Sequence, residues 1–272
     1  MIETIRHLMT DSIVAILIGV GILFLASKLL NGMFKIKYNI LDEVNESVIS
    51  ISIRNASIYI GISLAMIGVV ESPLWQLIDG LTAIVFMYVS TIISDKVLFP
   101  KIDNSFDIGK GNISLSLAEA GLFIGTGLIA QASFTGEGPW ISSIVFFMYG
   151  QLILIGAVFV AEKMYKNIVQ NIERYRISSG ILLGSIVLSF SMIISTALAG
   201  DFSGWLNDLA DVTVYAVFGF ILLFLFANKF IDYIYLPKTT ISEELENDNI
   251  AAIVIVSGMK IAIAMFIAGV IS

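Results

Sequence analysis

Eight apolar stretches of about 20 residues dominate this chain, and they constrain its fold more than any other feature. A helix of that length crosses the hydrocarbon core of a bilayer and satisfies its own backbone hydrogen bonds there. The sequence therefore predicts an all-α fold, a polytopic membrane bundle of eight transmembrane helices. The expected spans are residues 12–32, 48–70, 75–98, 112–134, 140–162, 177–200, 209–231 and 250–271.

Composition excludes several classes of protein. Charged residues make up 14% of the 272 residues, against about 25% in a soluble domain, which is too few to cover a water-facing surface. The chain has no cysteine and a single histidine, His7, so disulfides, thiol chemistry and a metal site are not expected. A formal net charge of -7 argues against nucleic acid as a partner. Nucleotide-binding and metalloprotease motifs are lacking, so we expect no enzymatic activity and no cofactor.

Positive charges divide unequally between the two sides of the predicted bundle. Of the 15 Lys and Arg residues, twelve lie in the segments after the first, third, fifth and seventh spans, and the other side holds only Arg6. Because Lys and Arg accumulate in cytoplasmic loops, we expect both termini on the extracytoplasmic side. The twelve are Lys28, Lys35, Lys37, Lys96, Lys101, Lys110, Lys163, Lys166, Arg174, Arg176, Lys229 and Lys238.

The tryptophans indicate an internal repeat. Trp75, Trp140 and Trp205 are spaced by 65 residues, and each closely follows a predicted outward turn. This placement is typical of an aromatic belt at the outer interface, and the equal spacing predicts a repeated helical hairpin. Each hairpin has a helix A that runs inward and a helix B that returns. Four hairpins form two parallel halves, residues 1–138 and 139–272, as in parallel-repeat transporters.

A second signature marks the B helices. Asparagines at Asn112, Asn171 and Asn249 each precede a glycine by nine positions, and they are expected where B helices start. Pairs of small residues four apart follow, and they let helix backbones approach closely, so the B helices are expected to pack centrally. The pairs are Ser57/Gly61, Gly121/Gly125, Gly180/Gly184 and Gly258/Ala262.

The helix-start segments resemble a known family. The segments at residues 111–121 (GNISLSLAEAG) and 248–252 (DNIAA) are similar to those of the bacterial YjfL-like inner-membrane family, a domain of unknown function with four-span units. The resemblance covers nearly the whole chain as two tandem units, although Val48 replaces the asparagine of the first B helix. It implies a bacterial inner-membrane location and association with membrane-stress systems, but no activity.

Any chemistry must come from polar groups inside the bilayer, where charges are costly. The repeat places a polar stripe along the B helices, formed by Asn55, Tyr59, Glu119, Thr126, Ser178, Ser185 and Lys260. Two interpretations stay open at this point. The stripe is either a pathway for a cation, proton or small cationic solute, or it reflects a structural Glu119–Lys260 ion pair between the halves. Arg54 is expected to snorkel toward the cytosolic interface.

Three aspartates, Asp79, Asp208 and Asp211, are expected just inside the outer interface. They could concentrate cations there, or they could simply remain where Lys and Arg are excluded. The sequence as a whole favours a small-solute or ion transporter or channel. The alternative is a non-catalytic membrane scaffold that acts in envelope stress or assembly through its cytoplasmic loops. A homo-oligomer and a cytosolic protein partner at the long loops are both compatible with the pattern.

Overall fold

The computed structural model describes residues 2–33, 49–67, 73–135, 138–165, 167–200 and 202–271. This part of the chain is helical and contains no strand. Eight of its helices are long and apolar enough to cross a membrane, as the sequence predicts. They are α1 (Ile2–Met33), α3 (Ile49–Ile67), α4 (Pro73–Ile93) with its π-helical extension η1 (Ser94–Leu98), α6 (Ile113–Phe134), α7 (Trp140–Met164), α9 (Ile177–Leu198), α10 (Trp205–Phe220) continued through η2 (Ile221–Ala227) into α11 (Asn228–Ile234), and α13 (Ile250–Ile271).

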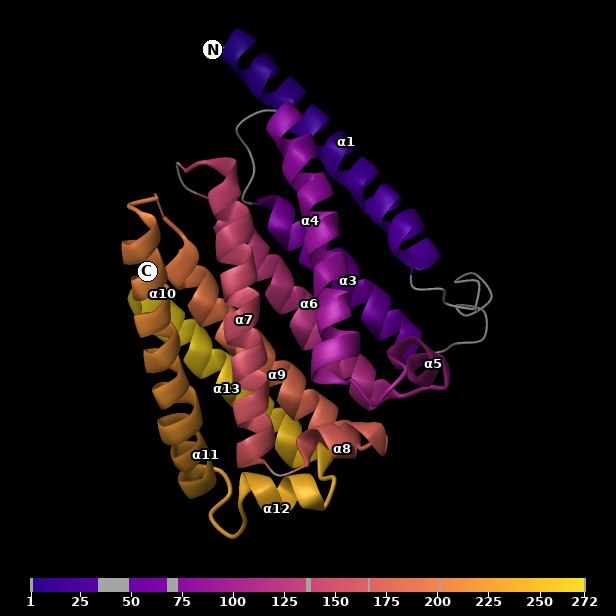
Figure 1. Cartoon of the computed structure of the whole chain (residues 1–272), viewed down its shortest axis with the longest axis vertical. Coiled ribbons are helices and arrows are strands. Elements are labelled where there is room, and N and C mark those ends of the chain that lie inside the picture. The colour runs from indigo at the N-terminus through magenta and orange to yellow at the C-terminus, as the bar shows by residue number, and fades with distance from the viewer. Residues whose placement is uncertain are drawn as a thin grey trace.

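Three short helices that the sequence pattern did not predict lie together at one end of the bundle (Figure 1). They are α5 (Asn104–Gly109), α8 (Ile168–Glu173) and α12 (Ile241–Glu246). Asp103 caps α5 and Thr240 caps α12, each through a side chain that accepts a backbone N–H. We call this end the short-helix end. The opposite end, where Trp75, Trp140 and Trp205 lie near helix starts, is the tryptophan end.

The four B helices form a row in the order α3, α6, α9, α13, in which each helix packs on the next. Glycine makes the inner contacts possible. A Cβ on Gly121 would overlap the backbone of Gly184, and a Cβ on Gly127 would overlap that of Gly61. A side chain cannot be added at such backbone contacts without separating the helices.

The small-residue pairs are expected where helix backbones approach closely, and on α13 this expectation is wrong. Gly125 is buried against α9, but a Cβ added there would overlap the side chain of Ser191, because this hydroxyl fills the space between the two helices one turn beyond Gly121. Gly258 and Ala262 are exposed, and nothing lies within contact of a Cβ added at Gly258. The reason is that α13 ends the row, so α9 is the one long B helix that packs against it.

The asparagines do not all start long helices, which corrects a second expectation. Asn171 lies inside α8, and the first turn of α9 follows Arg176 instead. Asn112 and Asn249 do accept backbone N–H bonds at the starts of α6 and α13. The short helix α8 takes up the segment that the repeat assigned to a helix start, so only two of the three asparagines act as caps.

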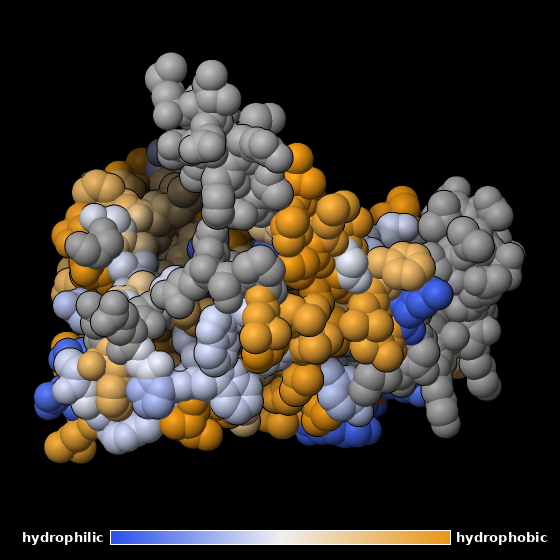
Figure 2. All heavy atoms as spheres, turned by 90° about the horizontal axis from the view of Figure 1, so that it is seen from above, coloured by the Kyte–Doolittle hydropathy of each residue, from blue (hydrophilic) through white to orange (hydrophobic). Residues whose placement is uncertain are grey.

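The A helices cover the row unevenly. Helices α4 and α7 pack on α6, whereas α1 and α10–α11 are the least buried of the spans. Large apolar side chains are exposed along these helices, as expected for surfaces that face lipid. Figure 2, which looks down on the molecule, shows broad apolar areas between smaller hydrophilic groups. Some A-helix phenylalanines, such as Phe147 and Phe224, are nevertheless fully buried.

Candidate functional site

A buried ion pair joins α3 to α6 near the short-helix end. Arg54 Nε lies 2.8 Å from Glu119 Oε2, and the two side chains are 2% and 0% exposed. The guanidinium also donates to Ser105 Oγ at 3.3 Å. Removing one partner from a buried pair typically costs about 3–5 kcal/mol, because the other charge is then stranded. The parallel packing of α3 on α6 brings the two residues to the same level.

The second oxygen of Glu119 is held by α4 and α5. Glu119 Oε1 accepts from Ser94 Oγ and from Asn104 Nδ2, both at 2.8 Å, and Asn104 also donates to Ser94 at 3.0 Å. Ser94 opens η1, a π-helical segment of the kind that often occurs at functional sites. We call Arg54, Ser94, Asn104 and Glu119 the ion-pair cluster.

The predicted Glu119–Lys260 pair is therefore wrong. Helix α9 separates α6 from α13 in the row, and Glu119 faces α3 and α4 instead. Arg54 does not snorkel to the interface either, because it is 1% exposed and is held by Glu119.

Lys260 occupies a separate buried site in the second half. Its ammonium donates to Asn228 Oδ1, which directly follows η2, and it lies 5.7 Å from the ring centroid of Tyr165. Burial raises the pKa of Tyr165, so its phenol stays protonated. Each half thus has a buried charged side chain that bonds to a residue in or next to a π-helical segment, Glu119 to Ser94 and Lys260 to Asn228.

A second group of buried polar side chains lies about two turns further along α6. Thr126 Oγ1 and Ser90 Oγ are 2.7 Å apart, and Gln151 Nε2 donates to Thr126 Oγ1 at 3.3 Å. All three residues are at most 2% exposed. Gln151 Oε1 has no hydrogen-bond partner in the described part of the chain. We call Ser90, Thr126 and Gln151 the hydroxyl cluster.

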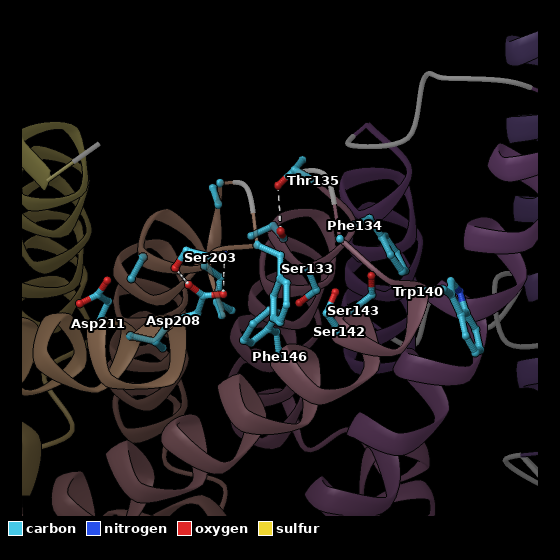
Figure 3. A pocket seen from close by; sticks show the side chains of 18 of the residues that line it. Ser133, Phe134, Thr135, Trp140, Ser142, Ser143, Phe146, Ser203, Asp208 and Asp211 are labelled. Carbon is cyan, nitrogen blue, oxygen red and sulfur yellow. Dashed lines mark hydrogen bonds between the residues drawn. The ribbon is translucent and has the colours of Figure 1, made fainter. Parts of the chain in front are cut away.

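A cavity of about 470 Å³ opens at the tryptophan end, between α4, α6, α7, α9 and α10. Ser133 of α6 and Ser142 of α7 face it around Phe146, and Asp208 sits beside Ser203 (Figure 3). Asp79, Asp208 and Asp211 all contribute to its lining, and no Lys or Arg does so among the described residues. Its size lies within the range of small-molecule sites.

Three phenylalanine rings lie near both this cavity and the hydroxyl cluster. Phe86 precedes Ser90 by one turn on α4, and Phe147 precedes Gln151 by one turn on α7. The two rings are stacked with centroids 3.6 Å apart, and Phe134 stacks on Phe86 at 5.6 Å. We call Phe86, Phe134 and Phe147 the phenylalanine stack. The stack thus extends from the cavity lining, which includes Phe134, to within one turn of Ser90 and Gln151.

The remaining residues of the predicted stripe do not lie on the face of α6 that carries Glu119 and Thr126. Tyr59 donates to Ser27 on α1 at 3.1 Å. Ser185 bonds back to its own helix, at Leu182 O, and Ser178 lies at the start of α9, where its N–H bonds to Asp248. Asn55 is partly buried on α3. Only Glu119 and Thr126 fall on one continuous polar face.

Sequence reasoning missed the partners on the A helices. Ser90 at the end of α4 and Ser94 at the start of η1 are four residues apart, and Gln151 is the single amide in the apolar helix α7. A polar residue in a span is a usable signal. The predicted stripe, however, includes residues of the B helices alone and no residue of the A helices. Groups of three or more acidic or histidine residues that could hold a metal are lacking in the described residues.

The fold and these buried groups define a multi-pass, all-helical membrane protein. Comparison with known proteins makes the class more specific. The model of the family described as Domain of Unknown Function (DUF350) matches residues 4–134 and again residues 136–271, so the chain belongs to this family. The chain is also 24% identical over 224 residues to a UPF0719 transmembrane protein of Aquifex aeolicus (strain VF5), which covers 79% of this chain and 83% of that protein. No solved structure matches this chain.

Proposed function

We propose that the protein transports a small cation or cationic solute, and that the route follows one face of α6. The observation that carries the proposal is the spacing of Glu119, Thr126 and Ser133, which lie seven residues apart on that face. Fourteen residues of helix correspond to ~21 Å, about two thirds of a ~30 Å hydrocarbon core. Buried polar groups in a membrane are costly, and they commonly mark substrate or ion pathways.

The ends of this line differ in a way that suits a cation. At the tryptophan end the cavity is lined by three aspartates, which favour positive charge. At the other end Glu119 offers a carboxylate held by Arg54. The phenylalanine stack closes the route between the cavity and the hydroxyl cluster in this conformation, as hydrophobic constrictions do in gated pores. The line thus lies between α4, α6 and α7, and not between the B helices alone.

The same proposal includes an orientation and an organisation. The short-helix end faces the cytoplasm of a bacterial inner membrane and both termini face out, which the uneven distribution of Lys and Arg supports. The chain consists of two parallel four-span units of a YjfL-like kind, residues 1–138 and 139–272. Two family matches of similar length support this division.

Flux through purified protein in proteoliposomes tests the transport function. We would measure uptake of sodium, potassium, protons and tetramethylammonium, and compare wild type with empty vesicles. Thr126→Val removes the hydroxyl that Ser90 and Gln151 contact, and we expect it to slow uptake about tenfold, as the loss of roughly 1.4 kcal/mol would. Ser185→Ala is the matched control, because Ser185 is also buried but bonds only to its own helix.

Two results would speak against the proposal. If folded wild-type protein moved none of the four probes, the scaffold alternative would be favoured. If Ser185→Ala slowed uptake as much as Thr126→Val, the route along α6 would be wrong.

A further inference from the structure

A second carboxylate adjoins the ion-pair cluster. Asp95 follows Ser94 in η1 and lies within electrostatic range of both Glu119 and Arg54. Its Oδ1 is buried and has no hydrogen-bond partner among the described residues. An ionised oxygen in this position is costly, because no donor replaces the water it has lost.

The charges around Asp95 do not balance. Arg54 is the buried cation, and it already contacts Glu119. Two further charged groups act on Asp95, the cation Lys96 and the anion Asp103, and both are exposed and opposite in sign. With every group ionised, two carboxylates share one guanidinium, so one negative charge lacks a buried cation in the described part of the chain.

Hydrogen-bond acceptors are also in excess here. Asn104 is 2% exposed, and because its Nδ2 donates to Ser94 and Glu119, its Oδ1 faces away from both. That Oδ1 is buried without a partner among the described residues, as Asp95 Oδ1 is. An excess of acceptors together with an excess of negative charge is relieved by one proton, since a protonated carboxyl is both neutral and a donor.

We propose that Asp95, beside the Arg54–Glu119 pair, binds one exchangeable proton, and that this proton is the coupling ion of the transport function proposed above. With the proton on Asp95, Arg54 pairs with Glu119 as the structure shows. Release breaks the Asp95 O–H bond, passes the proton to water at the short-helix end, and leaves a second anion that competes for Arg54. Only the coupling role rests on the proposed transport function.

Infrared spectroscopy of the purified protein tests the proton directly, without any flux measurement. A protonated carboxyl has a C=O stretching band that a carboxylate lacks. We expect this band in wild type at mildly acidic pH, its disappearance at alkaline pH, and its loss in Asp95→Asn, which preserves shape. Glu246→Gln is the control, because Glu246 is an exposed carboxylate at the same end, and it should keep the band.

Absence of the band in folded wild type at mildly acidic pH would overturn proton binding, and so would its persistence in folded Asp95→Asn. If Asp95→Asn does not fold, the pH titration of wild type decides, with release of one proton per chain expected. In proteoliposomes an imposed pH gradient should drive uptake. Uptake that ignores the gradient would overturn the coupling but leave transport standing, whereas absence of all uptake would overturn transport and leave the infrared result intact.

Discussion

Arg54 and Glu119 illustrate how one buried charge depends on another in a membrane protein. Both side chains are almost fully buried, and Glu119 has Ser94 and Asn104 as additional donors. The pair itself contributes less than its Coulomb attraction, because two charges had to lose their hydration. Removing one member should destabilise the protein more than removing both, because the remaining charge is then buried without a partner or water.

A double-mutant cycle checks this coupling. Glu119→Gln and Arg54→Met should each destabilise the fold by about 3–5 kcal/mol, and the double variant should cost less than the sum. The measurement is thermal unfolding in detergent, monitored by circular dichroism. The control cycle combines Glu119→Gln with Lys260→Met, whose partner is Asn228, and there the effects should add. Coupling in the control cycle and additivity in the first would contradict the structure.

At the scale of elements, contacts between backbones decide the position of each helix in the row. Gly121 touches the backbone of Gly184, and Gly180 touches that of Ser114, so α6 and α9 meet with no side chain between them at these positions. Gly258 on α13 is also a glycine, but no atom lies within contact of a Cβ added there. The two environments give a matched comparison within one molecule.

Gly121→Ala should therefore destabilise the protein by about 1–3 kcal/mol or more, because an added methyl forces two helices apart. Gly258→Ala should be neutral or slightly stabilising, since alanine is the better helix former. The yield of folded protein after gel filtration in detergent, together with the unfolding temperature, measures both effects. Equal loss in the two variants would mean that these contacts do not hold the row together.

The phenylalanine stack belongs to the same scale, because it joins α4, α6 and α7. Phe147→Ala should remove the barrier between the cavity and the hydroxyl cluster and so raise the leak of sodium or protons through proteoliposomes. Phe190→Ala is the control, because Phe190 is equally buried but packs against Phe220 and Phe224 away from the line. Both variants should lose about 3–5 kcal/mol of stability, so only a leak specific to Phe147→Ala supports a gate.

Apolar length was enough to predict the eight spans, because the bilayer fixes how many residues a helix needs to cross it. The largest difference is in the seventh span, which runs from Trp205 to Ile234. Its two added ends contain the polar residues Asp208 and Asp232, which interrupt the apolar run but not the helix. Which faces meet was less predictable. The pairing of Glu119 with Arg54 depends on the order of the helices in the row. Small residues occur on every B helix, so they do not indicate which helix lies at the end of the row.

At the scale of the whole molecule, the distribution of charge predicts one orientation. A reporter fused after Thr240 should report a cytoplasmic location, and one fused after Ser272 an extracytoplasmic location. The physical reason is that Lys and Arg resist translocation, and the sequence assigns twelve of the 15 to the same side of the membrane as Thr240. Alkaline phosphatase and fluorescent-protein fusions give opposite signals on the two sides. A fluorescent signal from the fusion at Ser272 would place the C-terminus in the cytoplasm and so contradict the proposed orientation.

The glycine contacts of the row also limit how the molecule could move. Helices whose backbones touch cannot slide or rotate past one another without a clash, so α3, α6 and α9 should behave as one rigid body. Any opening of the route then falls to α4, α7 and α10, which rest on that body through side chains that can change rotamer. The interruptions η1 and η2 lie in just this outer set, where a local change of helical winding shifts one end of a helix and leaves the other in place. We therefore expect α3, α6 and α9 to stay fixed relative to one another while α4, α7 and α10 move against them.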